Sequence, residues 1–84
     1  MSTITFQAGW REELVATCAE GILVFELTMG TYHLYFPTEK RWTTQVPAWA
    51  KNRWQAFLTA SERWCAAERI PLSLVDDAHV TTRK

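Results

Sequence analysis

The side chains in this chain that could act as nucleophiles are its two cysteines, Cys18 and Cys65. Cys18 alternates with apolar neighbours in a predicted strand, and Cys65 lies on the apolar arc of a predicted helix. Both are therefore expected to face the core. A buried cysteine packs as a small hydrophobic residue, and its thiol is inert. Since no Cys-x-x-Cys motif supports a redox pair, we expect both thiols to react slowly with alkylating reagents in the folded protein.

The titratable side chains that could do acid–base or metal chemistry are two histidines and a pair of adjacent aspartates. The predicted strand register places His33 opposite Glu26 on the outward face of a sheet, where the two would form a surface ion pair. His79 is expected in a terminal tail. Asp76-Asp77 lacks the spacing of a calcium loop and is typical of a solvated turn. Because the histidines are separated and the cysteines buried, no metal site is predicted.

Catalytic motifs are missing from the sequence. The chain has only three glycines and contains no GxGxxG, GxSxG, HExxH or phosphate-loop motif. We therefore predict no catalytic residue and no cofactor, and the chain is not expected to be an enzyme. A small enzyme is the third alternative, and it would require a deep pocket that holds a perturbed titratable group.

The elements that position these residues begin with strands. Thr3–Gln7 alternates threonine with apolar residues and predicts a first strand. Turns at Glu20-Gly21 and Met29-Gly30 fold residues 13–36 into a three-stranded meander. With two-residue loops, the predicted pairs are Cys18 with Leu23, Ala16 with Phe25, Leu14 with Leu27, Leu27 with Tyr32, Phe25 with Leu34, and Leu23 with Phe36. All these residues would share one apolar face.

A helix and a last strand follow the meander. Pro37 ends the third strand because it has no N–H for the ladder, and residues 38–45 are expected to form a polar connector. One long helix is predicted from Val46-Pro47 to about Arg69, with an apolar arc along one side. Leu72–Val75 predicts a short strand. The predicted fold is α+β: an antiparallel meander sheet of three to four strands, packed on one face by a single long helix, plus a short C-terminal strand.

Length and composition favour a single small domain. The chain has 84 residues, of which 48% are hydrophobic, which excludes a disordered chain. The ordered core is expected at about 3–77 and a frayed tail at about 79–84. The net charge of zero implies no general attraction to nucleic acid or membranes. Without a leader-like segment or a long apolar run, the predicted location is the cytoplasm, with no membrane association.

The outward face of the meander is the first candidate binding surface. It is more apolar than a solvated sheet face requires, and apolar patches on small proteins often bind partners. The candidate contact residues are Val15, Thr17, Ile22, Val24, Glu26, His33 and Tyr35. The leading interpretation is a small protein-interaction domain of the adaptor or inhibitor type, with homodimerisation through this face as its simplest form.

A cluster of basic and aromatic residues is the second candidate surface. It consists of Lys40, Arg41, Trp42, Trp49, Lys51 and Arg53. Aromatic rings beside cationic groups can stack on bases and bind phosphates, so a nucleic-acid-binding module is the alternative function. The simpler interpretation is that Trp42 folds back onto the core. The sequence leaves open whether Trp10 and Trp42 are buried, and where Leu72–Val75 pairs.

Overall fold

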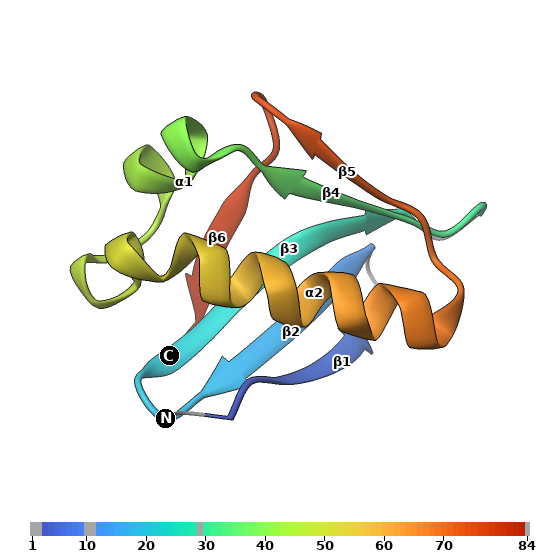
Figure 1. Cartoon of the computed structure of the whole chain (residues 1–84), viewed down its shortest axis with the longest axis horizontal. Coiled ribbons are helices and arrows are strands. Elements are labelled where there is room, and N and C mark those ends of the chain that lie inside the picture. The colour runs from blue at the N-terminus through green and yellow to red at the C-terminus, as the bar shows by residue number, and fades with distance from the viewer. Residues whose placement is uncertain (1–2, 10–11, 29, 84) are drawn as a thin grey trace.

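The computed structural model describes residues 3–9, 12–28 and 30–83, and it has the predicted α+β architecture (Figure 1). Four strands come first: β1 (Thr5–Gly9), β2 (Glu13–Cys18), β3 (Gly21–Thr28) and β4 (His33–Pro37). Three helical segments follow: α1 (Glu39–Gln45), the 3-10 helix η1 (Ala48–Arg53) and α2 (Trp54–Glu68). The chain then returns to the sheet as β5 (Leu72–Val75) and β6 (Val80–Arg83).

The strands form one six-stranded sheet in the order β1-β2-β3-β4-β5, with β6 paired to β3. The long strand β3 shares one of its edges between two partners. Residues 22–25 pair with β6, and residues 26–28 pair with β4. All pairs are antiparallel except β4 with β5. The strand count is larger than predicted, because β6 adds to the sheet.

The predicted loops are wrong, although the predicted faces are correct. Cys18 pairs with Gly21 and Ala16 with Leu23, so the first loop is Ala19-Glu20. Thr28 pairs with His33, and the second loop is longer than two residues. Each register differs from the prediction by two residues, and side chains in a strand alternate with a period of two. Every strand residue of the meander therefore keeps its predicted face.

Three segments outside the meander differ from the predictions. The polar connector forms α1, which Thr38 caps by accepting a hydrogen bond from the backbone N–H of Arg41 (3.4 Å). The predicted long helix begins as η1 and continues as α2, which ends at Glu68. The tail that was expected to fray contains β6, because Val80 is buried and residues 80–83 pair with β3. Leu72–Val75 is a strand as predicted, and it extends the sheet beyond β4.

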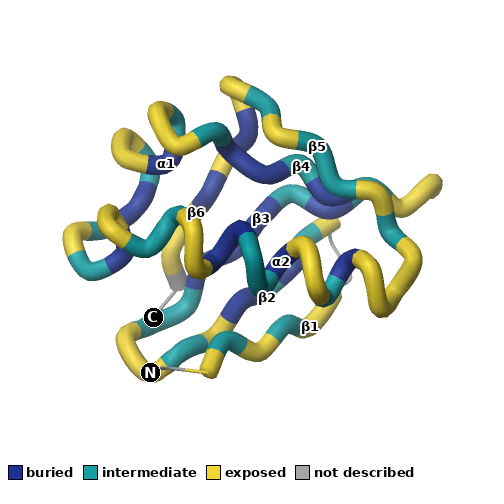
Figure 2. Tube along the Cα trace, viewed as in Figure 1, coloured by how far each residue is buried: buried dark blue, intermediate teal, exposed yellow. Residues whose placement is uncertain are grey.

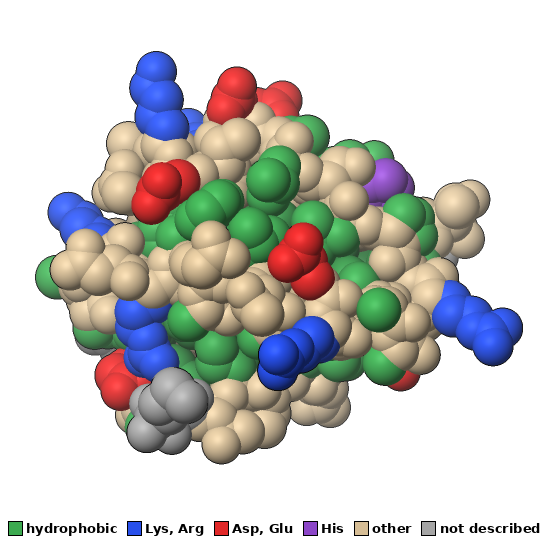
Figure 3. Space-filling model, viewed as in Figure 1, with side chains coloured by type: hydrophobic (Ala, Val, Ile, Leu, Met, Phe, Trp, Pro, Cys, Tyr) green, Lys and Arg blue, Asp and Glu red, His purple; other side chains and the backbone are tan. Residues whose placement is uncertain are grey.

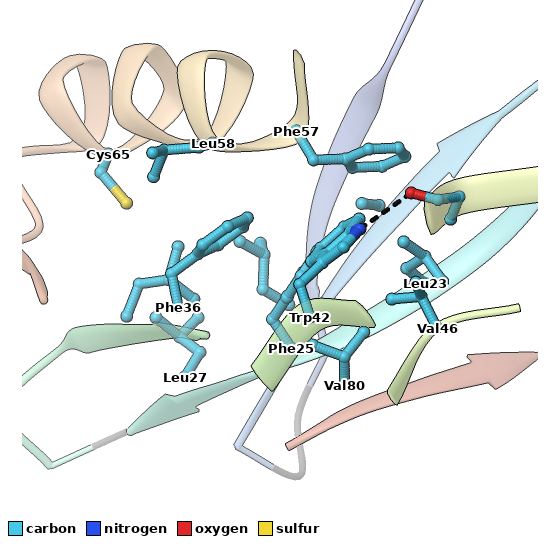
Figure 4. Packing of buried hydrophobic residues seen from close by; sticks show 14 residues of the cluster. Leu23, Phe25, Leu27, Phe36, Trp42, Val46, Phe57, Leu58, Cys65 and Val80 are labelled. Atoms are coloured by element: carbon cyan, nitrogen blue, oxygen red, sulfur yellow. Dashed lines mark hydrogen bonds between the residues drawn. The ribbon is translucent and has the colours of Figure 1, made fainter. Parts of the chain in front are cut away.

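The core lies between the sheet and the helices, and Trp42 stands at its centre (Figure 4). The Trp42 side chain is fully buried, and its indole N–H donates to the carbonyl oxygen of Ala50 over 2.8 Å. Its ring packs against Phe25, Phe36 and Phe57 at centroid distances of 6.1, 5.6 and 5.5 Å. The interpretation in which Trp42 folds back onto the core is confirmed. Trp10 lies outside the described residues.

Burial is unevenly distributed over the sheet (Figure 2). Half of the residues of the central strand β3 are buried and the others are half-buried, whereas β1 has only exposed and half-buried residues. In Figure 1, α2 crosses in front of the sheet, and β1 lies at the margin of the sheet. Among the residues that the structure describes, no helix has both the length and the apolar character needed to cross a lipid bilayer.

Candidate functional site

The two cysteines lie where the strand and helix patterns place them. Cys65 on α2 is only 2% exposed, and burial raises the pKa of its thiol from 9.0 to about 11. Cys18 is half-buried at the end of β2 and packs against the core. Neither cysteine forms a disulfide. The slow reaction of both thiols with alkylating reagents stays a prediction.

The predicted pair of Glu26 and His33 does not form, because the register differs by two residues. Glu26 pairs instead with Tyr35, and its carboxylate accepts a hydrogen bond from the backbone N–H of His79 (2.6 Å). The His33 ring stacks on the Tyr35 ring, with centroids 4.5 Å apart. Its Nε2 atom forms a hydrogen bond with the Ser73 hydroxyl over 2.7 Å.

The contact between His33 and Ser73 joins two residues that are 40 positions apart in sequence. Sequence reasoning missed it because nothing in the local pattern shows that β5 pairs with β4. A serine hydrogen-bonded to a histidine can act as a nucleophile only if a third group orients the imidazole and donors receive the oxyanion. This hydrogen bond is half-buried on the outer face of the sheet, and its structural effect is to link β5 to β4.

The register confirms that the seven residues of the predicted contact face share one side of the sheet. Val15 pairs with Val24, Thr17 with Ile22, and Glu26 with Tyr35. Little of this apolar surface is exposed. Val24 is only 7% exposed, and within this set only Thr17 is exposed rather than half-buried or buried. Binding of a partner at this face stays a prediction.

The predicted basic and aromatic cluster is not one surface. Trp42 is buried in the core and cannot stack on a base. Arg53 forms a salt bridge with Glu20 and lies 5.8 Å from the centroid of the Phe57 ring. The Arg41 side chain donates through Nε to the carbonyl oxygen of Ala78 (3.2 Å). Of the six residues, the exposed ones are Lys40 and Lys51.

A groove between β1 and α2 is the site that sequence reasoning missed. Phe6 on β1 and Ile4 just before that strand line it from one side, and Ala56, Ala60 and Arg63 line it from the helix. This β1–α2 groove has a volume of about 820 Å³, compared with about 370 Å³ for the hollow beside His79. On the face viewed in Figure 3, hydrophobic side chains are exposed between acidic and basic ones.

The groove is mainly apolar, with few polar groups. The rings of Phe6 and Trp64, which both line it, have centroids 6.0 Å apart. The Gln55 amide donates to the Thr59 hydroxyl (3.2 Å), which holds the Gln55 side chain along the helix. Arg63 is exposed, and among the described residues that line the groove it is the one with a charge. It forms no ion pair with any described side chain.

The strand that borders the groove has an unpaired edge. β1 pairs with β2 on one side and ends the strand order of the sheet on the other. Proteins usually block such an edge with lysine, proline or a bulge, and Thr5-Phe6-Gln7-Ala8-Gly9 has no charge, no proline and an uninterrupted register. Two other described strands have an unpaired side: β5, which lies between Pro71 and Asp76-Asp77, and β6, which pairs only with β3 and carries the charged Arg83. Of these three strands, β1 has neither a charged residue nor a flanking proline, and it borders the β1–α2 groove.

Two small residues on the solvent side of the helix are the only sequence signal for this groove. Ala56 and Ala60 leave space where α2 passes β1. The signal is weak, because alanine is also common on solvated helices. Which strand lies beside these alanines depends on the strand order of the sheet.

Comparison with known proteins gives no match: no family model, no curated protein and no solved structure matches this chain. Within the described ranges, no three His, Cys, Asp or Glu side chains come together as a metal site would require. We therefore take the β1–α2 groove, with its volume of about 820 Å³ and its apolar lining, as the candidate site.

Proposed function

We propose that this chain is a non-enzymatic protein-interaction domain that binds an extended segment of another protein along β1. The observation that carries this proposal is the unpaired edge of β1 directly beside the apolar β1–α2 groove. An edge strand presents backbone N–H and C=O groups to an incoming strand, and a neighbouring groove receives its alternate side chains. Together they supply both affinity and selectivity for an extended segment.

The size of the site suggests a weak, reversible interaction. β1 has five residues, so a bound segment would make only a few backbone hydrogen bonds. Interfaces that bury less than about 1,200 Å² are typical of transient complexes. We therefore expect a dissociation constant in the micromolar range, on the order of 10 µM.

Charge favours another protein over a second copy of this chain as the occupant. Among the described lining residues Arg63 carries the charge, so a second copy docked groove to groove would bring a second arginine. Like charges across an interface are unfavourable. Homodimerisation through the outer sheet face has less support, since Val24 is only 7% exposed. Nucleic-acid binding has less support as well, because Trp42 is buried.

The proposal can be tested by selecting peptides from a displayed random library of twelve-residue sequences. Selection would use the wild-type protein, and each enriched peptide would be measured against two variants. Ala56→Arg fills the groove with a long side chain and should weaken binding at least tenfold. Ala66→Arg makes the same change at an exposed position of α2 outside the groove, and it should leave binding unchanged.

Two results would overturn the proposal. The first is that no peptide is enriched on the wild-type protein over the Ala56→Arg variant. The second is that enriched peptides bind both variants equally, which would place their site away from the groove. Circular dichroism of both variants would verify that they fold.

A further inference from the structure

We infer that the segment bound along β1 carries two apolar side chains two positions apart, with a carboxylate two positions beyond them. This inference rests on the proposed function and names the class of its partner. It follows from three features of α2: the spacing of Ala56 and Ala60, the place of Arg63 after them, and the charge of Arg63.

The spacing of the two alanines matches the repeat of a strand. A helix rises about 1.5 Å per residue, so Ala56 and Ala60 lie roughly 6 Å apart along its axis. In a strand, side chains two positions apart point to the same face and are roughly 6.6 Å apart. In Figure 1 both elements run from left to right, β1 rising and α2 descending, so that they cross at an acute angle. A strand added to β1 would thus place consecutive inward side chains over Ala56 and Ala60.

The third inward side chain of the segment would meet Arg63. Arg63 comes three residues after Ala60, about 4.5 Å further along the helix axis, and its long side chain covers the remaining distance to a strand position at roughly 13 Å. A carboxylate can receive two hydrogen bonds from a guanidinium group. Since Arg63 has no ion-pair partner among the described residues, it is free to bind one.

Other chemistries fit the groove less well. A third apolar side chain would remove the Arg63 guanidinium from water without a partner, which is costly. A basic side chain would face a like charge. The direction of the segment is not set by these features, so the carboxylate can stand at either end of the motif.

The inference can be tested with four synthetic peptides, acetylated and amidated at their ends. The first contains Val-Thr-Val-Thr-Glu, the second Glu-Thr-Val-Thr-Val, and the other two carry Lys in place of Glu. Their affinities would be measured by fluorescence anisotropy. At least one Glu peptide should bind the wild-type protein about threefold or more tightly than its Lys partner. The preference should shrink as salt is raised.

Charge reversal supplies the matched test. Arg63→Glu should reverse the preference, so that the Lys peptide binds more tightly than the Glu peptide. Lys51→Glu makes the same reversal from positive to negative charge at an exposed position on η1, outside the groove, and should leave the preference as it is.

The outcomes separate this inference from the proposed function. If Glu and Lys peptides bind equally and Ala56→Arg abolishes both, the groove binds strands and the carboxylate inference is wrong. If no peptide binds at millimolar concentration and the library selection also fails, both are wrong. If the preference survives Arg63→Glu, the carboxylate is recognised elsewhere, and the inference is overturned.

Discussion

The indole of Trp49 packs directly on the α-carbon of Gly21. A Cβ atom at position 21 would lie 2.8 Å from the Cζ2 atom of Trp49, which is closer than side chains tolerate. The φ angle of Gly21 is not positive, so the turn itself does not require glycine here. Gly21 is required by packing, and the contact joins the start of β3 to η1.

Replacement of Gly21 should therefore destabilise the fold. Gly21→Ala forces the Trp49 ring to move, and overpacking of this kind costs about 1–3 kcal/mol of unfolding free energy. Urea denaturation would measure the loss. Gly30→Ala is the matched control, because nothing lies within 4 Å of a Cβ at that position. Equal stability of the two variants would contradict the packing role of Gly21.

The hydrogen bond of Trp42 should be a second source of stability. Trp42→Phe keeps an aromatic ring in the core but leaves the Ala50 carbonyl without its donor, and an unsatisfied buried group costs about 1–3 kcal/mol. The same change at Trp64, whose indole N–H makes no hydrogen bond with the described residues, should cost less. Denaturation of both variants tests this, and a Trp64→Phe loss as large as that of Trp42→Phe would show that ring volume dominates.

The prediction of sheet faces succeeded because side-chain alternation does not depend on loop length. Leu14, Phe25 and Phe36 are buried as predicted, even though both registers differ from the prediction by two residues. The pairing of His33 with Glu26 failed for the same reason, since a pair depends on the register itself. Local patterns determine the face of a residue, and loop geometry determines its partner.

Features that depend on contacts distant in sequence could not be predicted. The segment of α1 is polar in sequence, and its single buried residue, Trp42, is held by partners from β3, β4 and α2. Residues 80–83 form a strand because they pair with the part of the β3 edge that β4 leaves unpaired. The β1–α2 groove is of this kind too, because it exists only where β1 ends the sheet beside Ala56 and Ala60.

The Cys65 thiol should make stability depend on pH in the alkaline range. Its pKa is raised from 9.0 to about 11 by burial. Below pH 9 the thiol is protonated in both the folded and the unfolded chain. Between pH 9 and about 11 only the unfolded chain ionises, so the free energy of unfolding should fall as pH rises, by roughly 2–3 kcal/mol in all.

The Cys65→Ala variant isolates this contribution from other alkaline titrations. The variant has a cavity and a lower stability at every pH, but its stability should fall less steeply than that of the wild type between pH 9 and 11. Urea denaturation at several pH values would measure both slopes. Parallel slopes would show that Cys65 ionises equally in the folded and unfolded chains.

Glycine in place of Arg69 should stabilise the C-terminal end of α2. Arg69 adopts the left-handed conformation, with φ 59° and ψ 43°, which is strained for residues other than glycine. Arg69→Gly should raise the unfolding free energy by about 0.5–1 kcal/mol and the melting temperature by about 3–6 °C. Glu68→Gly, one residue earlier and still helical, should lower both instead. A thermal melt of each variant would measure the change. A lower melting temperature for Arg69→Gly would show that the backbone of Arg69 is not strained.

Binding along β1 is the central claim, and amide chemical shifts test it most directly. A ¹⁵N-labelled sample would be titrated with the Val-Thr-Val-Thr-Glu and Glu-Thr-Val-Thr-Val peptides. The largest shifts are expected on β1, on Ala56 and Ala60, and on the Trp64 indole N–H. Shifts centred on the outer face around Val24 and Tyr35, or no shifts at millimolar peptide, would contradict it.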